Sequence, residues 1–352
     1  MKVAIDLSSI TGHSKDAHKV RGIGSYTRGL LFSLKLYAPQ HEIVGFNSPA
    51  DIPNDADIAH YTYFDPFFLS LPFTKKTKTV ITVHDFIPLL FPDHFPAGIK
   101  GTLRWQIQRF LLRKMDGIIS VSECTTKDCM SLTNTPQSKI RTIYSAGADI
   151  FAEPLSQSDL TRIKKHYNLP QRFILYVGDA TWNKNLPRLL KAATLSKIPL
   201  VMAGKALVQE FDQSNSWNSD LVEISALTEE SSFFRKLGYV PQKDLVGLYS
   251  LALTLVMPSL YEGFGFPILE AMMAGCPVIT AKKGAIPEIA SDAALYVDPM
   301  DVASIAEGIN KFAQNGGKRN EYIKMGAVQA SKFTWKKTAE QTASYYQEIY
   351  GR

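Results

Sequence analysis

The chain has 352 residues, of which 45% are hydrophobic and 20% charged, and this globular composition excludes a largely disordered protein. At roughly 150 residues per domain, the length predicts two domains. No apolar run approaches the roughly 18 residues that span a bilayer, and residues 1–12 lack the apolar core of a secretory signal. We therefore expect a cytoplasmic protein without a transmembrane helix.

The net charge of +6 is uneven along the chain. Residues 1–165 carry a net charge of +5, and residues 166–352 carry +1. This bias is either unremarkable or indicates an anionic partner of the first half: a phosphate-bearing substrate, a membrane surface or nucleic acid. Nucleic acid is disfavoured because aromatic residues do not interleave with a basic stripe.

The cysteines do not form a framework. There are three of them, Cys124, Cys129 and Cys276. They are too few for a disulfide scaffold, and their spacing fits no zinc site without further ligands. We expect reduced thiols and no bound metal.

Short apolar, β-branched runs alternate with helical patterns through both halves, which predicts βαβ units and parallel sheets. In the first half, a helix is expected over residues 25–36, and strands over 2–6, 42–46, 58–61, 79–83, 117–121 and 139–143. A helix over residues 156–169 precedes the second half. Strands are expected there over 173–177, 200–203, 237–239, 253–257, 277–280 and 294–297, followed by a last helix over 334–350.

Two segments of the first half are candidates for ligand binding: a glycine segment well beyond the first strand, and a polar segment directly after a later strand. Gly22 and Gly24, followed by Tyr26, lead into the first helix, where close backbone approach and free N–H groups suit a diphosphate. The segment lacks the third glycine of a dinucleotide fingerprint and does not directly follow the first strand, which disfavours a dinucleotide site. A structural loop and a diphosphate cradle are equally compatible with it. His84 and Asp85 follow a strand, either at a reacting sugar or as a bonded histidine and a turn cap.

Two segments of the second half follow strands in the same way. Residues 178–186 contain Lys184, a point charge for a phosphate, and Lys205 is a weaker case after the next strand. Residues 258–271 form a glycine-rich turn before a helix that starts near Pro267, with Glu262 before the turn and Glu270 on the helix. Free helix N–H groups suit a diphosphate, and carboxylates accept hydrogen bonds from sugar hydroxyls.

The segment from Glu262 to Glu270 resembles the Glu-x7-Glu signature of retaining glycosyltransferases of the GT-B fold, particularly glycosyltransferase family 4. Further segments match in the family's order across nearly the whole chain: Gly22–Gly24, residues 84–88, 121–123, 177–178, 183–185, 275–278, 287–288 and 333–335. The resemblance implies two Rossmann-like α/β/α domains facing a central cleft. The acceptor domain would cover residues 1–165 plus a crossover helix over 335–352, and the nucleotide-sugar donor domain 166–334.

The resemblance also implies roles for single residues. His84, Lys184 and Glu262 would be catalytic: His84 at the sugar ring, Lys184 on the leaving diphosphate, and Glu262 on the sugar hydroxyls. Glu270 would bind the ribose, and Asp85 and Tyr26 the acceptor. The other donor-binding residues would be Gly22, Gly24, Lys205, Gly263, Phe264, Gly265, Phe266, Pro267, Ile268 and Leu269.

The implied reaction transfers a hexose with retention, without metal or cofactor, from a nucleotide-diphosphate sugar as co-substrate to a glycan or lipid-linked saccharide. GDP-mannose is favoured as donor, and UDP-glucose or UDP-N-acetylglucosamine are alternatives. A non-catalytic nucleotide-sugar-binding module is the alternative from another class. The chain departs from the family at Asp179, where many relatives have an arginine that pairs with the lysine.

Residues 100–115 combine Arg104, Arg109, Arg113 and Lys114 with apolar side chains. Such a basic amphipathic helix can lie on anionic lipid at the inner face of the membrane. The favoured alternative is a surface helix whose apolar stripe, with Trp105, Ile107, Phe110 and Leu111, packs on the sheet.

Overall fold

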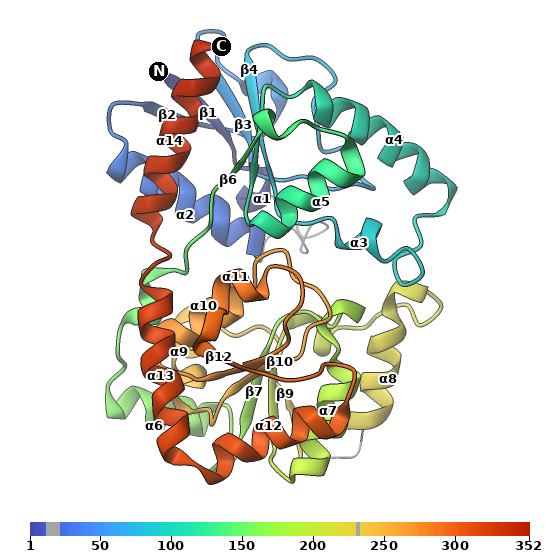
Figure 1. The fold of residues 1–352 in the computed structure, drawn as a ribbon, viewed down its shortest axis with the longest axis vertical. Coiled ribbons are helices and arrows are strands. Elements are labelled where there is room, and N and C mark those ends of the chain that lie inside the picture. The colour runs from blue at the N-terminus through green and yellow to red at the C-terminus, as the bar shows by residue number, and fades with distance from the viewer. Residues whose placement is uncertain (12–21, 230–232) are drawn as a thin grey trace. The chain divides into compact units, whose positions relative to one another are not determined.

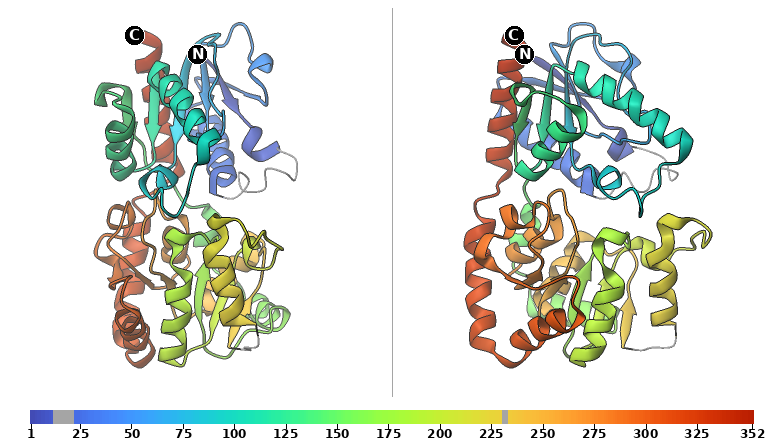
Figure 2. Two further views of the ribbon diagram at one scale, coloured as in Figure 1. Left: turned by 90° about the vertical axis from the view of Figure 1, so that its right-hand side faces the viewer. Right: turned by 45° about the vertical axis from the view of Figure 1, so that its right-hand side comes forward.

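A computed structural model describes residues 1–11, 22–229 and 233–352 (Figure 1). Arg21, which directly precedes the predicted glycines Gly22 and Gly24, lies outside the described residues. The chain divides into two compact units. Unit 1 contains residues 1–146 and 333–352, and unit 2 contains residues 147–332. Both chain ends therefore belong to unit 1, where the labels N and C stand in Figure 2.

Unit 1 is built on a parallel six-stranded sheet in the order β2-β1-β3-β4-β5-β6. Its strands are β1 (Lys2–Asp6), β2 (Glu42–Phe46), β3 (Ile58–Tyr61), β4 (Lys78–Val83), β5 (Gly117–Ser120) and β6 (Ile140–Thr142). The predicted strands of this half are confirmed to within a residue or two at each end. The chain order reverses between β1 and β3, so the loops after these two strands open at the switch point of the sheet.

Helices cover both faces of this sheet, because alternate strand residues point to opposite sides. One face presents Ile81 and Val83 to α4 (Gly98–Lys114) and α5 (Glu123–Thr133), whose Leu112 and Cys129 join the same apolar cluster. Within the described residues this unit also contains α1 (Ser8–Thr11), α2 (Gly22–Tyr37), α3 (Ile87–Leu90) and the last helix of the chain.

The last helix, α14 (Trp335–Gly351), packs along α2 on the other face of the sheet (Figure 1). Its N-cap is Thr334, whose hydroxyl accepts from the Lys337 amide. Gly29 allows α2 to lie close to the start of α14, because a Cβ at position 29 would be only 2.1 Å from the Trp335 ring. The tyrosine hydroxyl of Tyr345 donates to the Lys139 carbonyl at 2.7 Å, which fixes the far end of α14.

Unit 2 repeats the architecture with the strand order β12-β11-β10-β7-β8-β9, all pairs parallel. Its strands are β7 (Ile174–Val177), β8 (Leu200–Ala203), β9 (Phe234–Lys236), β10 (Leu255–Met257), β11 (Val278–Thr280) and β12 (Ala294–Tyr296). The chain order reverses between β7 and β10, which places the switch point of this sheet between those strands. The predicted α/β class is confirmed.

One predicted strand is wrong. The strand expected over residues 237–239 is β9, three residues earlier at Phe234–Lys236. Gly238 has φ +66°, a left-handed conformation that interrupts an extended strand. The apolar residues after it therefore belong to the turn before α9.

The helices of unit 2 are α6 (Gln157–His166), α7 (Leu186–Ser196), α8 (Ser219–Thr228), α9 (Gln242–Leu251), α10 (Phe266–Met273), α11 (Ile286–Ala290), α12 (Val302–Gln314) and α13 (Gly316–Ala330). Helix α6 packs on α9, so it belongs to unit 2. The division at residues 146 and 147 thus falls earlier than the expected boundary at 165, which assigned α6 to the first domain.

A search of residues 1–11, 22–229 and 233–352 finds no helix with both the length and the apolar content needed to cross a bilayer.

Candidate active site

The switch point of unit 2 brings two predicted residues together. Lys184 lies in the loop after β7, and Glu262 lies in the loop after β10. The lysine Nζ is 2.8 Å from both carboxylate oxygens of Glu262. Glu262 is only 5% exposed, so the pair is largely removed from water. A partly buried cation and a buried anion thus lie where open α/β sheets bind their ligands.

Two asparagines beside Lys184 hold the loops together. Asn183 donates its side-chain amide to the Tyr261 carbonyl at 3.0 Å, and its own carbonyl accepts from the Leu260 amide at 2.7 Å. Asn185 donates to the carbonyls of Pro258 and Pro299, and its φ of 59° reverses the chain into α7. Both asparagine side chains are buried, so the position of Lys184 is fixed by the loop that carries Glu262.

Gly284 supports Glu262 from the loop after β11. The amide of Ala285 donates to the Glu262 carbonyl at 2.9 Å. Gly284 has φ +56°, and a Cβ there would lie 2.5 Å from the carbonyl oxygen of Glu262. A side chain at position 284 would therefore both strain the backbone and push Glu262 out of place.

We expect Gly284→Ala to lower the unfolding free energy by about 1–3 kcal/mol, from the left-handed backbone and the overpacked contact. Activity should fall with it, because Glu262 moves relative to Lys184. Thermal unfolding and initial rates check both effects. The control is Gly316→Ala, where nothing lies within 4 Å of an added Cβ. Equal stability and activity of Gly284→Ala and the wild type would contradict the assignment.

The turn after Glu262 leads into α10. Gly265 has φ +100° at the N-cap, and no side chain within the described ranges caps the helix. The amides of Ile268 and Leu269 donate to the Gly265 carbonyl, so they are not free for a ligand. Both of these side chains are also fully buried. The expectation that Ile268 and Leu269 bind the donor is therefore corrected. The turn that precedes them is the part of this stretch that could still contact a donor.

The other residues of this predicted stretch serve packing or helix initiation. Phe264 is 4% exposed, and its ring lies 4.9 Å from that of Phe266. Pro267 occupies the first turn of α10, where its missing N–H costs nothing. Gly263 is buried beside Glu262. A donor would reach this stretch through its backbone.

Glu270 lies on α10 and is bonded to a tyrosine that the sequence did not single out. The Tyr249 hydroxyl donates to Glu270 Oε2 at 3.0 Å, from α9. Burial raises the pKa of Glu270 to about 7, and the bond from Tyr249 partly opposes this. Tyr249 is fully buried against Phe151, which holds the hydroxyl in place. No residue among those described donates to Glu270 Oε1, so this oxygen could accept from a ligand hydroxyl.

Lys205 follows β8, the strand beside β7, and its ammonium has no bonded partner within the part of the chain that the structure describes. A Cβ on Gly204 would lie 2.0 Å from the Gly178 carbonyl, so the loops after β7 and β8 are in backbone contact. Lys205 is thus a second cation at the edge that carries Lys184. The Asp179 carbonyl accepts from the Tyr176 hydroxyl in the same loop.

In unit 1, His84 follows β4 and is partly buried. Its Nε2 lies 3.0 Å from the Thr62 carbonyl, and burial lowers its pKa to about 4. Asp85 accepts from the Ile87 amide at 3.0 Å at the start of α3, which matches the turn-cap interpretation.

Gly22 and Gly24 lie in the first turn of α2, not in a loop before the helix. Tyr26, on the same helix, is fully buried and its hydroxyl lies 3.1 Å from Thr82 Oγ1. This corrects the expectation that Tyr26 binds the acceptor, because its hydroxyl is enclosed in the core. Its ring packs edge-on against His84 at 4.9 Å between centroids.

Sequence reasoning missed Tyr249, Gly284 and Thr62. Gly284 had a usable signal, because a glycine between β11 and α11 precedes the Pro287-Glu288 pair. Tyr249 and Thr62 had none, since each acts only through a neighbour distant in the sequence.

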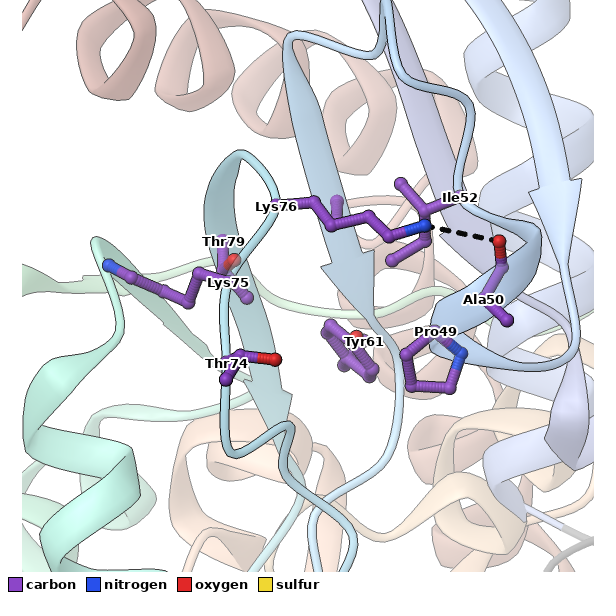
Figure 3. A pocket seen from close by; sticks show the side chains of 9 residues that line it. Pro49, Ala50, Ile52, Tyr61, Thr74, Lys75, Lys76 and Thr79 are labelled. Atoms are coloured by element: carbon purple, nitrogen blue, oxygen red, sulfur yellow. Dashed lines mark hydrogen bonds between the residues drawn. The ribbon is translucent and has the colours of Figure 1, made fainter.

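A cavity of about 240 Å³ lies elsewhere in unit 1 (Figure 3). It is lined by Tyr61, Lys75, Lys76 and Thr79, with Lys76 reaching across to the Ala50 carbonyl at 3.2 Å. Thr79 is near the amino end of β4, the end opposite His84. None of the predicted site residues lines this cavity.

Two doubly wound parallel sheets, one in each unit, are the architecture of the GT-B fold. The Anabaena protein Alr3699/HepE, solved in complex with UDP and glucose, is similar with a TM-score of 0.73 at 17% identity, covering 98% of both chains. The profile of the Glycosyltransferase Family 4 matches residues 16–146, and that of the group 1 glycosyl transferases matches 158–329. The chain belongs to glycosyltransferase family 4, group 1, and is a glycosyltransferase.

Two of the relatives similar to this chain are named mannosyltransferases. The O-antigen chain mannosyltransferase B of Escherichia coli is 32% identical over 301 residues, covering 82% of this chain and 75% of the relative. The serotype-specific mannosyltransferase WbdA of Escherichia coli is 27% identical over 78% of this chain. The chain spans about a third of WbdA, since only 34% of that longer protein is covered.

Proposed function

We propose that this protein is a retaining mannosyltransferase that moves mannose from GDP-mannose to a glycan or lipid-linked saccharide acceptor. The observation that carries the proposal is the Lys184–Glu262 pair at the switch point of the second sheet. The pair sets a cation where the diphosphate would leave and a carboxylate where sugar hydroxyls would donate. The relatives' names support mannose.

The transfer develops positive charge on the sugar and negative charge on the departing phosphate. Electrostatic stabilisation of that phosphate is the largest help that the protein can give. Lys184 supplies it, with Lys205 at the adjacent loop. The departing phosphate takes the proton of the acceptor hydroxyl, which attacks on the same face and retains the configuration.

Glu262 is not assigned as a nucleophile. Both of its oxygens are 2.8 Å from Lys184 Nζ, so its charge is neutralised by a partner held in place. A glycosidase of the retaining type instead needs two carboxyl groups about 5–5.5 Å apart, one attacking and one protonating. The pairing of Glu262 with a lysine supports direct transfer within this site.

The test is a donor screen by thermal shift followed by a transfer assay. Of GDP-mannose, UDP-glucose and UDP-N-acetylglucosamine, only the true donor should raise the melting temperature strongly, because it binds the native state alone. That donor should then be consumed in the presence of an oligomannose acceptor with an α-linked product. If only a UDP-sugar stabilises the protein, that UDP-sugar and not GDP-mannose is the donor. Binding of a nucleotide sugar without transfer or hydrolysis would indicate a non-catalytic binding module.

We also propose peripheral contact of unit 1 with an anionic membrane surface at its cytoplasmic face, through α4. Trp105, Ile107 and Leu111 pack against the core, as the surface-helix interpretation predicts, but Phe110, which that interpretation also placed on the sheet, does not. Ile99, Leu103 and Phe110 are instead 91%, 63% and 56% exposed. At 100° per residue these three lie within about 40° of one another, on the side of the helix away from the core.

Charge complements this exposed apolar stripe. Residues 98–114 contain five basic and no acidic residues, and residues 66–83 contain three basic and no acidic residues. Gln108 of α4 ties these segments together by donating to the carbonyls of Asp65 and Phe68. The eight positive charges exceed the +6 of the whole chain. Apolar and basic groups side by side suit anionic lipid.

The triple variant Ile99→Ser, Leu103→Ser, Phe110→Ser should bind anionic vesicles at least tenfold more weakly than the wild type, by co-sedimentation. Each lost apolar side chain removes buried area at the lipid surface. The matched control is Leu195→Ser, Met300→Ser, Val328→Ser, which removes three comparably exposed apolar side chains from unit 2. Equal binding by the two triple variants, or no salt-dependent binding by the wild type, would remove this surface from the proposal.

A further inference from the structure

Three buried hydroxyls form a directed chain in unit 1. The Ser9 hydroxyl donates to Thr27 Oγ1 at 2.9 Å, Thr27 donates to Thr62 Oγ1 at 2.8 Å, and Thr62 donates to the Asp6 carbonyl at 3.1 Å. All three hydroxyl side chains are fully buried. Since each hydroxyl has a single proton, the chain can satisfy all of its donors in this one direction.

The chain of hydroxyls joins elements that meet at the switch point of the first sheet. Asp6 ends β1, and Thr62 follows the last residue of β3. Ser9 and Thr27 come from α1 and α2, which cover this end of the sheet. Thr62 is therefore fixed by bonds to two other elements, and its carbonyl points at His84 Nε2, 3.0 Å away.

The contact with the Thr62 carbonyl determines which ring nitrogen of His84 carries the proton. A carbonyl oxygen can only accept, so Nε2 must carry the hydrogen. Burial lowers the pKa of His84 to about 4, so the ring is neutral at neutral pH and Nδ1 keeps its lone pair. No residue that the structure describes bonds to Nδ1. The ring therefore offers one acceptor in a fixed direction.

A second set of contacts fixes the plane of the ring. The Tyr26 ring stands edge-on to His84, with 87° between the planes. Tyr26 is in turn bonded to Thr82, whose Oγ1 lies 2.8 Å from His60 Nε2. His60 Nδ1 lies 2.5 Å from the Tyr346 hydroxyl on α14. Turning the His84 ring to point Nε2 elsewhere would break its bond to the Thr62 carbonyl and its edge-on contact with the anchored Tyr26 ring.

We propose that Thr27 and Thr62 are positioning residues that hold His84 as its Nε2–H tautomer, so that Nδ1 accepts a hydrogen bond from a sugar hydroxyl during transfer. This role rests on the proposed function, but the tautomer is a property of the free protein. The residues lie outside every motif that carries the family resemblance, and their hydroxyls are buried and bonded within unit 1.

The test measures the tautomer directly by long-range proton–nitrogen NMR of protein labelled with ¹⁵N-histidine, with His84→Gln identifying the His84 signals. The wild type should show a neutral ring protonated at Nε2. Thr27→Val and Thr62→Val should give mixed tautomers and a kcat about tenfold lower, with the donor KM changed less than twofold. Thr27→Ser keeps the hydroxyl and should restore both readouts.

Thr133→Val is the matched control, because Thr133 is equally buried and donates to the Cys129 carbonyl far from His84. It should lower the melting temperature and leave the tautomer and kcat unchanged. An Nδ1–H tautomer in the wild type, or wild-type kcat in folded Thr27→Val, overturns the positioning role while the proposed function stands. The expected tautomer in a protein that turns over no nucleotide sugar instead overturns the proposed function.

Discussion

Lys184→Ala is expected to lower kcat by about 10²–10³-fold, with a smaller change in the donor KM. The leaving diphosphate gains charge in the transition state, and loss of one preorganised donor to such a charge costs about 2.7–4 kcal/mol. Steady-state kinetics with the identified donor measure the effect. The matched control is Lys191→Ala, which breaks the exposed pair of Lys191 with Glu223 in the same unit and should leave kcat unchanged.

The ion pair adds a second, opposite expectation. In the free protein the charge of Lys184 is shared with Glu262, which is 6% exposed at its side chain. Glu262→Gln should release the ammonium and tighten the binding of the diphosphate product, whereas Lys184→Ala should weaken it. Loss of one partner of a buried pair can also cost about 3–5 kcal/mol of stability, so each variant is compared at a temperature where circular dichroism shows it folded.

A kcat within twofold of the wild type in folded Lys184→Ala would sink the assignment of Lys184 to the leaving group. Weaker product binding in Glu262→Gln would contradict the shared-charge argument, since that variant keeps the lysine. The two variants thus separate the cation's role in turnover from its restraint by the carboxylate.

Periodicity was sufficient to predict the fold class, because parallel strands buried on both faces are continuous apolar runs. Strands β1 and β10 are both short apolar runs of this kind. Composition does not predict a strand boundary where the backbone conformation of one residue sets it. Residues 237–239 fit a strand by composition, but Gly238 has a left-handed backbone, and β9 ends at Lys236.

The candidate site divides in the same way. Lys184 and Glu262 could be predicted as residues that follow strands, and neighbouring strands place them at one edge. Their contact could not be predicted, since it depends on Asn183 and Asn185 bonding to a loop more than seventy residues away. The prediction for Tyr26 fails for a related reason. A tyrosine that follows two glycines in the sequence can point to solvent or to the core, and on α2 its side chain points into the core.

Glu270 gives the largest expected effect on nucleotide binding. Its carboxylate would accept from ribose hydroxyls, and a hydrogen bond to a charged group contributes about 1.5–3 kcal/mol. Glu270→Gln should therefore weaken the binding of GDP-mannose by about 10–150-fold, with a smaller effect on kcat. Isothermal titration calorimetry measures this. The intact sugar nucleotide is the right probe, because it has no terminal phosphate that titrates near neutral pH.

The pH dependence of that binding has a defined sign. Since the pKa of Glu270 is raised to about 7, the carboxyl is mostly protonated at pH 6 and mostly ionised at pH 8. Affinity for GDP-mannose should rise about tenfold across this interval in the wild type and stay flat in Glu270→Gln. The folded state holds this proton more tightly than the unfolded chain, so stability should fall as pH rises from about 4.5 to 7.

Tyr249→Phe decides whether the buried carboxyl is the group that titrates. The Tyr249 hydroxyl stabilises the ionised form of Glu270, so its removal should move the midpoint of the affinity curve to higher pH. Tyr322→Phe serves as the control, because it removes a tyrosine hydroxyl from α13, where the ring packs against Phe312. A midpoint that moves to lower pH in Tyr249→Phe, or one that persists in Glu270→Gln, would show that another group governs the binding of the nucleotide.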